Sequence, residues 1–200
     1  MKVFVVYCHP CGDSFTAEVC SAFLKGLRDA GHSFEVSDLY AMKFDPVFSE
    51  AEYRREAFYR DDMPVPSDII EEQRKINNAD AIAFIYPVFW TECPALLTGW
   101  FQRVWTYGFA YGSASMKQLD KALFLVTMGG SMKDTVRLEQ IEAMKTVMIG
   151  DRIHDRARSA EMVIFDEMTR GYGNNKNRAE RAERFTEQAY NIGLTMKGEE

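Results

Sequence analysis

Runs of apolar residues alternate along this chain with segments of helical periodicity. Residues 1–7 are almost continuously apolar, which predicts a strand that is covered on both faces. In residues 14–30 the apolar positions recur at helical spacing, Ser14 can cap the N-terminus and Gly31 ends the pattern, so we predict a helix there. A second, shorter strand is predicted at residues 34–38.

The same alternation continues to the end of the chain. Residues 39–63 interrupt it with a long polar and aromatic stretch of little periodicity, a kind of segment that is usually functional or interfacial. Alternating strands and helices favour right-handed crossovers, so we expect an α/β fold with a doubly wound, five-stranded parallel sheet and helices on both faces. The remaining helices are predicted at residues 66–77, 94–105, 134–149 and 177–195, and the remaining strands at residues 81–86, 121–127 and 162–165.

Composition and charge narrow the classes of function. With 200 residues, of which 46% are apolar, the chain suits a single domain over residues 1–200. A net charge of −6 without a clustered basic face argues against a nucleic-acid partner. The basic stretches 152–158 and 176–184 also contain acids, and we interpret them as solvated helix faces.

The sequence also bears on where the protein acts. No apolar run approaches the ~20 residues that span a bilayer, and the start lacks the basic-then-apolar layout of a signal peptide. We therefore expect a cytoplasmic protein without membrane insertion. Its cysteines, at positions 8, 11, 20 and 93, should then be mostly reduced.

Three of the predicted strands end in loops that suit a ligand, at residues 9–16, 87–92 and 127–131. Parallel sheets bind ligands at the carboxyl ends of their strands, where such loops can meet. The first loop runs straight into a helix, and the unpaired N–H groups of a first helical turn favour an anion, so this loop is a candidate phosphate site. Each loop taken alone also fits an ordinary turn or helix cap. Their joint occurrence favours the ligand site.

The second and third loops suit a planar ring. Phe89 and Trp90 lie where a flat heterocycle could stack, and Gly129 and Gly130 would let another backbone approach that ring closely. A phosphate at the first loop with a planar ring between the other two is the arrangement that a flavin requires. The alternative is that the aromatic residues only close the end of the strand.

Cysteine and histidine positions suggest two other chemistries. Cys8 and Cys11 form a Cys-x-x-Cys pair after a strand, as in thiol–disulfide oxidoreductases, but the helix begins only near Ser14. His9 and His154 are available to a metal, but no second cysteine pair stands at ligand spacing, and we predict no metal site. The chain contains neither a Gly-x-Ser-x-Gly motif nor a phosphate-loop lysine motif, which disfavours hydrolases and kinases.

Several short motifs follow one another in a specific order between Lys2 and Ser131. They comprise His9 with residues 14–16, residues 37–42 with Asp45 and Pro46, residues 68–73, residues 87–90 with 94–97, and residues 99–101, 108–111 and 127–130. In these motifs the chain resembles the flavodoxin-like NAD(P)H:quinone oxidoreductases, the DT-diaphorase-type family. The likeness is weak in the later residues. A match over so many ordered segments is far more specific than one glycine pair.

The resemblance implies a flavodoxin-like fold and a flavin-dependent reductase. NAD(P)H would pass two electrons to the flavin by hydride transfer, leave, and be replaced in the same pocket by a quinone or a similar small aromatic acceptor. We expect FAD, because residues 39–63 and the late helix around Arg178 could hold an adenosine half, with FMN as the alternative. In this family the pocket lies at a homodimer interface, to which residues 99–105 would contribute a contact helix.

The resemblance also implies which residues form the site. Trp90 and Tyr111 would line the substrate pocket as the catalytic residues. The flavin would be bound by His9, Ser14, Phe15, Thr16, Pro87, Val88, Phe89, Trp90, Thr91, Thr127, Met128, Gly129 and Gly130.

Three features depart from the family pattern. The family's tyrosine and histidine proposed to relay charge to the reduced flavin correspond here to Thr135 and Ile141. The second tyrosine of the substrate-gating pair corresponds to Ser113, and Cys11 stands where the family usually has no thiol. These changes affect the choice of acceptor more than hydride transfer. Two alternatives stay open: a flavin- or nucleotide-binding regulatory subunit of a transport system, and thiol–disulfide exchange by Cys8 and Cys11.

Overall fold

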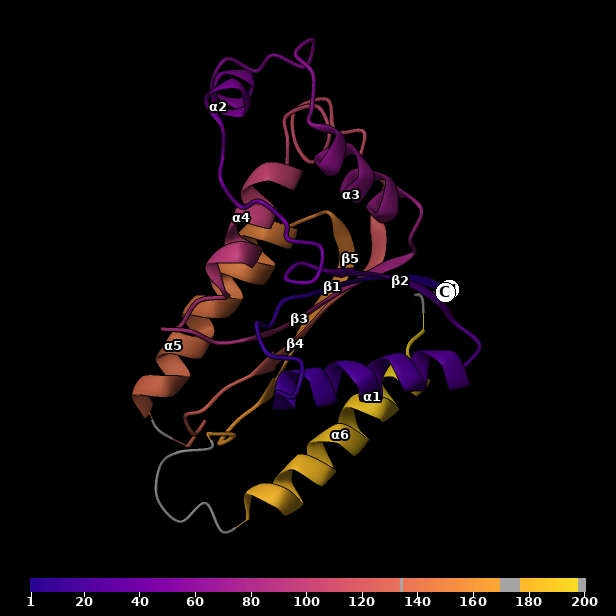
Figure 1. The fold of residues 1–200 in the computed structure, drawn as a ribbon, viewed down its shortest axis with the longest axis vertical. Coiled ribbons are helices and arrows are strands. Elements are labelled where there is room, and N and C mark those ends of the chain that lie inside the picture. The colour runs from indigo at the N-terminus through magenta and orange to yellow at the C-terminus, as the bar shows by residue number, and fades with distance from the viewer. Residues whose placement is uncertain (134, 170–176, 198–200) are drawn as a thin grey trace.

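A five-stranded parallel sheet forms the centre of the computed structural model, which describes residues 1–133, 135–169 and 177–197. The strands lie in the order β2-β1-β3-β4-β5, and every neighbouring pair is parallel (Figure 1). The predicted α/β class and doubly wound sheet are confirmed. In chain order the strands are β1 (Lys2–Tyr7), β2 (Ser33–Asp38), β3 (Ala81–Pro87), β4 (Leu119–Thr127) and β5 (Ala157–Phe165).

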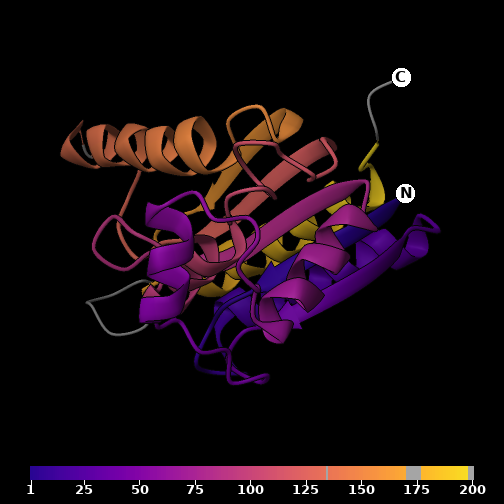
Figure 2. The same cartoon turned by 90° about the horizontal axis from the view of Figure 1, so that it is seen from above.

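Helices cover both faces of this sheet. The helices α1 and α6 lie side by side on one face, and α3 and α4 lie on the other (Figures 1 and 2). Among the described residues, no helix combines the length and the apolar character that crossing a membrane requires. The helices are α1 (Phe15–Asp29), α2 (Glu50–Ala57), α3 (Ser67–Asn77), α4 (Ala95–Val104), α5 (Thr135–Lys145), the π-helix η1 (Thr146–Ile153) and α6 (Arg178–Leu194).

The sheet separates two hydrophobic cores because successive side chains of a strand point to opposite faces. In β1, Val3 and Val5 pack against α1 and α6, whereas Phe4 and Val6 pack against α3 and α4. The central strand β3 is buried at every position, as its continuous apolar run predicts. Both faces are therefore closed, and the ends of the strands carry the polar loops.

Two glycines set the distance between α1 and α6. A Cβ on Gly26 would overlap the carbonyl oxygen of Tyr190, and a Cβ on Gly193 would overlap the carbonyl oxygen of Phe23. The two helices can approach this closely only because neither glycine has a side chain. This contact holds α6 against α1, and the same packing places Arg178 in the wall of the cavity that also contains Phe15.

Three predicted segments differ from the structure. Residues 39–63 contain the short helix α2, which Ser49 and Glu52 start with a reciprocal capping box. The strand β5 begins at Ala157 rather than at residue 162, because backbone pairing with β4 continues through polar residues. The helix predicted at residues 134–149 consists of α5 and η1 and continues to Ile153, while residue 134 lies outside the described residues.

The interpretation of residues 152–158 as a solvated helix face is wrong. The guanidinium of Arg152 lies over the ring of Phe101, 4.9 Å from its centroid, and Arg156 donates to the carbonyl of Ala110 at 2.9 Å. An arginine can cover an aromatic face in this way while its charge stays near a carboxylate, here Glu92 at 3.5 Å. Of the second basic stretch, residue 176 lies outside the described residues and residues 178–184 belong to α6.

Candidate functional site

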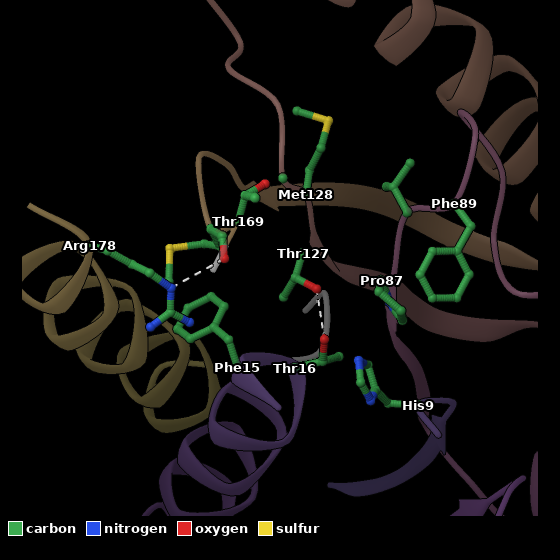
Figure 3. Close-up of a pocket in the computed structure, with 12 residues that line it drawn as sticks. His9, Phe15, Thr16, Pro87, Phe89, Thr127, Met128, Thr169 and Arg178 are labelled. Carbon is green, nitrogen blue, oxygen red and sulfur yellow. Dashed lines mark hydrogen bonds between the residues drawn. The ribbon is translucent and has the colours of Figure 1, made fainter. Parts of the chain in front are cut away.

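The three predicted loops meet around one cavity of about 240 Å³ at the carboxyl ends of β1, β3 and β4 (Figure 3). Parallel strands bring their carboxyl ends to one edge of the sheet, which explains why loops so far apart in sequence become neighbours. The loop after β5 and the first turn of α6 complete the wall. The lining residues are His9, Phe15, Thr16, Pro87, Val88, Phe89, Thr127, Met128, Gly129, Met168, Thr169 and Arg178.

His9 provides a hydrogen-bond donor at the first loop. Its Nδ1 accepts from the backbone N–H of Cys11 at 3.0 Å. In the tautomer with its proton on Nε2, Nδ1 accepts from this N–H and Nε2 can donate to a ligand, whereas the other tautomer would donate from Nδ1 to the carbonyl of Cys11, which is also 3.0 Å away. The ring lies beside Thr16 and Pro87 in Figure 3. This polarity suits an anionic ligand oxygen.

The hydroxyl groups of Thr16 and Thr127 join the first loop to the third. Their oxygens are 2.7 Å apart and both residues are buried. Ser14 does not line the cavity, but its Oγ accepts from the N–H of Ala17 at 3.1 Å and so caps α1. The predicted anion site at the start of α1 therefore has its helix terminus, its cap and its link to β4 in place.

The second loop makes a tight turn between Phe89 and Glu92, whose backbones exchange hydrogen bonds of 2.9 and 3.0 Å. The two central residues, Trp90 and Thr91, adopt left-handed backbone angles, with φ of 52° and 66°. Side chains rarely tolerate this conformation, and it often occurs at functional sites. Phe89 lines the cavity, while Trp90 is 99% exposed and is not among the lining residues. Neither Trp90 nor Thr91 lines the cavity in this chain, and their predicted roles stay predictions.

The third loop requires glycine for a reason other than ligand access. A Cβ on Gly129 would overlap the side-chain oxygen of Thr169, and a Cβ on Gly130 would lie 2.9 Å from Nε of Arg137. Gly129 lines the cavity, whereas Gly130 does not. Protein atoms therefore occupy the space that a side chain on either glycine would take.

The loop after β5, which was not among the predicted ligand loops, holds the third loop in place. The N–H of Met168 donates to the carbonyl of Met128 at 3.1 Å, and the N–H of Glu167 donates to the carbonyl of Gly130 at 2.9 Å. The hydroxyl of Ser131 donates to Glu167 at 2.7 Å and is the main cause of the lowered pKa of that carboxyl group. The rule that identified the other loops, a polar turn directly after a buried strand, would also have found Met168 and Thr169.

Arg178 places an unsatisfied cationic donor in the cavity wall. Its Nε donates to the carbonyl of Met168 at 3.3 Å, and among the described residues its buried Nη2 has no hydrogen-bond partner. A buried donor without a partner is costly, so a ligand acceptor at this position would be stabilising. Arg178 and His9 thus fit a ligand with an anionic group.

Tyr111 does not line this cavity. It precedes β4, while the cavity lies after that strand, and a nine-residue strand separates its two ends by about 27 Å. The loop that contains Tyr111 lies beside α2 and α3 in Figure 1. Its hydroxyl donates to Glu56 at 2.6 Å, and burial together with this carboxylate raises the pKa of Tyr111. The structure of one chain does not bring Tyr111 and Trp90 together at the cavity.

Of the cysteine pair, Cys8 has little nucleophilic character. Cys8 is fully buried, and burial raises the pKa of its thiol to about 12, whereas Cys11 is exposed. Since the thiolate is the reactive form, Cys8 stays unreactive near neutral pH. The two relay positions cannot transfer a proton in the family's manner either. Ile141 is buried in a cluster with Met128, and Thr135 is exposed.

Comparisons with known proteins agree with this geometry. The family model described as the flavodoxin-like fold matches residues 1–188. The chain is 36% identical over 149 residues to NAD(P)H dehydrogenase [quinone] 1 of Cavia porcellus, covering 65% of this chain and 54% of that protein. It is 35% identical over 151 residues to ribosyldihydronicotinamide dehydrogenase [quinone] of Mus musculus, covering 65% and 64%. The match thus spans about half to two thirds of the length of these curated relatives.

Solved structures extend the likeness over the whole chain. An NAD(P)H:quinone oxidoreductase from Methanothermobacter marburgensis superposes with a TM-score of 0.91 at 38% identity, covering 100% of this chain and 98% of that one. An FMN-dependent NADH-azoreductase from Bacillus anthracis, at 15% identity and a TM-score of 0.65, shares the fold.

Proposed function

This chain belongs to the family of proteins with the flavodoxin-like fold, and on that premise we propose that it is a flavin-dependent NAD(P)H oxidoreductase that reduces quinones or similar small aromatic acceptors. The observation that carries the proposal is the cavity shared by the three strand-end loops, whose wall contains the buried Nη2 of Arg178 without a hydrogen-bond partner among the described residues. The names of the relatives point to the same reaction class.

The lining residues include both polar groups and apolar side chains. His9, the first turn of α1 and Arg178 would hold the phosphate groups. Pro87, Phe89 and Met128 would cover the flavin ring and exclude water from it. A bound flavin supplies the two-electron exchange between the nicotinamide and the acceptor. The protein's own contribution is to bind, orient and shield the reacting groups.

We propose FAD rather than FMN as the cofactor. The start of α1 and His9 provide for one phosphate, whereas Arg178 approaches the cavity from a different helix and leaves Nη2 for a second anionic group. FMN carries one phosphate and FAD carries two. An FMN-dependent neighbour shares this fold, so FMN is the alternative.

We further propose a homodimer whose partner completes the site. A cavity of about 240 Å³ is smaller than the ~300–1,000 Å³ usual for ligand sites, and neither Trp90 nor Tyr111 lines it in its own chain. Beside the turn that contains Trp90 lies a second hollow of about 650 Å³, and half of its lining residues belong to α4, which includes most of the predicted contact segment 99–105. Its lining residues are Pro46, Phe89, Glu92, Cys93, Ala95, Thr98, Gly99 and Gln102. We also propose a cytoplasmic location, where cysteines such as the four free ones of this chain stay reduced.

Release of the bound flavin from the purified protein, followed by its mass determination, tests the cofactor proposal. The expected species is FAD, retained through purification or taken up by the colourless protein with a 1:1 stoichiometry. A protein that binds neither FAD nor FMN would contradict the proposed function. Menadione-dependent oxidation of NADH or NADPH then distinguishes the reductase from a regulatory subunit, which would bind flavin with little turnover.

A further inference from the structure

The carboxylate of Glu56 lies beneath the loop that contains Tyr107 and Tyr111. Its Oε2 accepts from the N–H of Tyr107 at 2.7 Å and from the hydroxyl of Tyr111 at 2.6 Å. Its Oε1 accepts from Nη1 of Arg55 at 2.7 Å. With only 14% of its side chain exposed, Glu56 is a nearly buried acceptor that serves three donors. Hydrogen bonds to a shielded carboxylate are short and strong.

The helix that carries Glu56 is itself fixed to the body of the protein. Arg103 of α4 donates to Glu52 at 2.7 Å and to Asp68 at 2.8 Å. Arg55 donates from Nε to the carbonyl of Met63 at 3.1 Å, which closes the segment behind α2. The position of Glu56 is therefore set by α3 and α4.

The backbone of Tyr111 is held by the N–H of Gly108, which donates to its carbonyl at 2.9 Å, and its side chain has an aromatic and a polar contact. Its ring meets the ring of Tyr107 edge to face at a centroid distance of 5.6 Å, and Tyr107 in turn meets Tyr59 at 5.2 Å. Gly108 and Gly112 flank the loop with φ of 82° and 74°, a conformation that favours glycine. The bond to Glu56 is thus the polar contact that sets the direction of the Tyr111 hydroxyl.

We infer that Glu56 is a positioning residue, which orients the Tyr111 hydroxyl so that its oxygen presents a hydrogen-bond acceptor to an aromatic substrate carrying an N–H or O–H donor. The inference rests on the proposed function, in which Tyr111 reaches the site of a second copy. A phenol hydroxyl has one proton, and Tyr111 donates it in the hydrogen bond to Glu56. Only the lone pairs of the hydroxyl oxygen then remain for a ligand. An unsubstituted quinone offers carbonyl acceptors alone and gains nothing from Tyr111. An amino-substituted quinone gains a hydrogen bond.

The test compares two acceptors in the flavin-loaded enzyme, 2-amino-1,4-naphthoquinone and 2-methyl-1,4-naphthoquinone. The quantity measured is the ratio of their kcat/KM values. In Glu56→Gln we expect the ratio of the amino to the methyl compound to fall about fivefold, which is the usual contribution of one hydrogen bond. The fall should come from a higher KM for the amino compound. Tyr111→Phe should lower the ratio equally, and the double variant should lower it no further. An unchanged ratio in Tyr111→Phe would overturn the inference.

Matched controls separate positioning from general damage. Glu50→Gln removes an exposed carboxylate from the same helix, where it pairs with Arg54, and should leave the ratio as in the wild type. A loss of folding in Glu56→Gln is detected by its melting curve, and Tyr111→Phe then decides alone. A wild type that reduces neither quinone contradicts the proposed function, whereas one that reduces both with the same ratio in every variant contradicts only the role of Glu56.

A second readout needs no turnover. Ultraviolet titration of the tyrosines in the full-length protein should show one tyrosine that ionises at lower pH in Glu56→Gln than in the wild type, because the carboxylate that raises the pKa of Tyr111 is gone. This step should be missing from the variant that also carries Tyr111→Phe. Identical titration curves for wild type and Glu56→Gln would overturn the inference.

Discussion

Replacing Arg103 by Met should destabilise the protein strongly, because it breaks the link between the 39–63 segment and the helices beneath it. The guanidinium donates to Glu52 at 2.7 Å, to the carbonyl of Asp45 at 2.7 Å and to Asp68 at 2.8 Å. The side chains of Arg103 and Glu52 are only 7% and 8% exposed. Removal of one partner of such a pair leaves an uncompensated buried charge, which costs ~3–5 kcal/mol.

The magnitude follows from the pair with Glu52. Asp68 is 44% exposed and stays hydrated when its partner is lost, so it adds little. Methionine restores most of the buried volume, and we therefore expect a loss near the lower limit, about 3 kcal/mol. In a chain of this length that corresponds to a decrease in Tm of about 6–12 °C.

Scanning calorimetry and urea unfolding provide the measurement. Arg54→Met is the matched control, since the pair of Arg54 with Glu50 is exposed and its loss should not change the Tm measurably. Adding Glu52→Gln to Arg103→Met removes the orphaned charge and should recover part of the stability. A loss below about 1 kcal/mol for Arg103→Met, or a double variant that is less stable than the single one, would refute the reasoning.

Three further predictions concern the cavity. Arg178→Gln should weaken FAD binding about tenfold or more and leave FMN binding nearly unchanged, because it removes the charged donor that we propose for the second phosphate. Calorimetric titration measures both affinities. Iodoacetamide at pH 8.5 should label Cys11 but not Cys8, whose pKa of about 12 keeps it a thiol until the pH rises far higher, as peptide mass mapping can show. Gly129→Ala should lower FAD affinity about tenfold, and Thr169→Ala in the same chain should restore it, because the added methyl group overlaps the Thr169 side chain.

Each of these predictions has a result that counts against it. Arg184→Gln, an exposed arginine of the same helix, should leave FAD binding unchanged, and an equal effect of both substitutions would show a general charge effect. Equal labelling of both thiols would show that the first loop is open. A Gly129→Ala variant with normal FAD affinity would show that the third loop can shift without cost.

The sequence predicted the sheet and the meeting of its loops because both depend on local signals. The continuous apolar runs of β1, β3 and β4 indicate strands that are buried on both faces of a parallel sheet. Because the carboxyl ends of parallel strands meet at one edge, His9, Phe89 and Gly129 are then expected there together. The capping box of Ser49 and Glu52 was an equally local signal for α2 and was missed.

The direction of Trp90 could not be predicted from its residue type. Left-handed turns usually contain Gly, Asn or Asp, and neither Trp90 nor Thr91 is one of these. The turn is imposed by backbone pairing between Phe89 and Glu92 and by the bond from the N–H of Val88 to the carbonyl of Thr127 at 2.9 Å. The bond between Val88 and Thr127 forms only in the folded sheet.

Long-range pairing explains the other gaps. The partner of Tyr111, Glu56, lies 55 residues earlier in a segment without periodicity, and no spacing rule connects the two. The start of β5 at Ala157 depends on hydrogen bonds with β4 rather than on apolar side chains. The prediction of a solvated helix face around Arg152 failed for a similar reason. The position of this guanidinium over the ring of Phe101 depends on how η1 lies against α4.

Anaerobic spectroscopy of the flavin-loaded protein tests the central claim most directly. Addition of one equivalent of NADH or NADPH should bleach the visible flavin absorbance, and one equivalent of menadione should then restore it, because hydride donor and acceptor use the same cavity in turn. A bound flavin that stays oxidised with both nicotinamides, or one that is reduced but is not reoxidised by any quinone, would contradict the account.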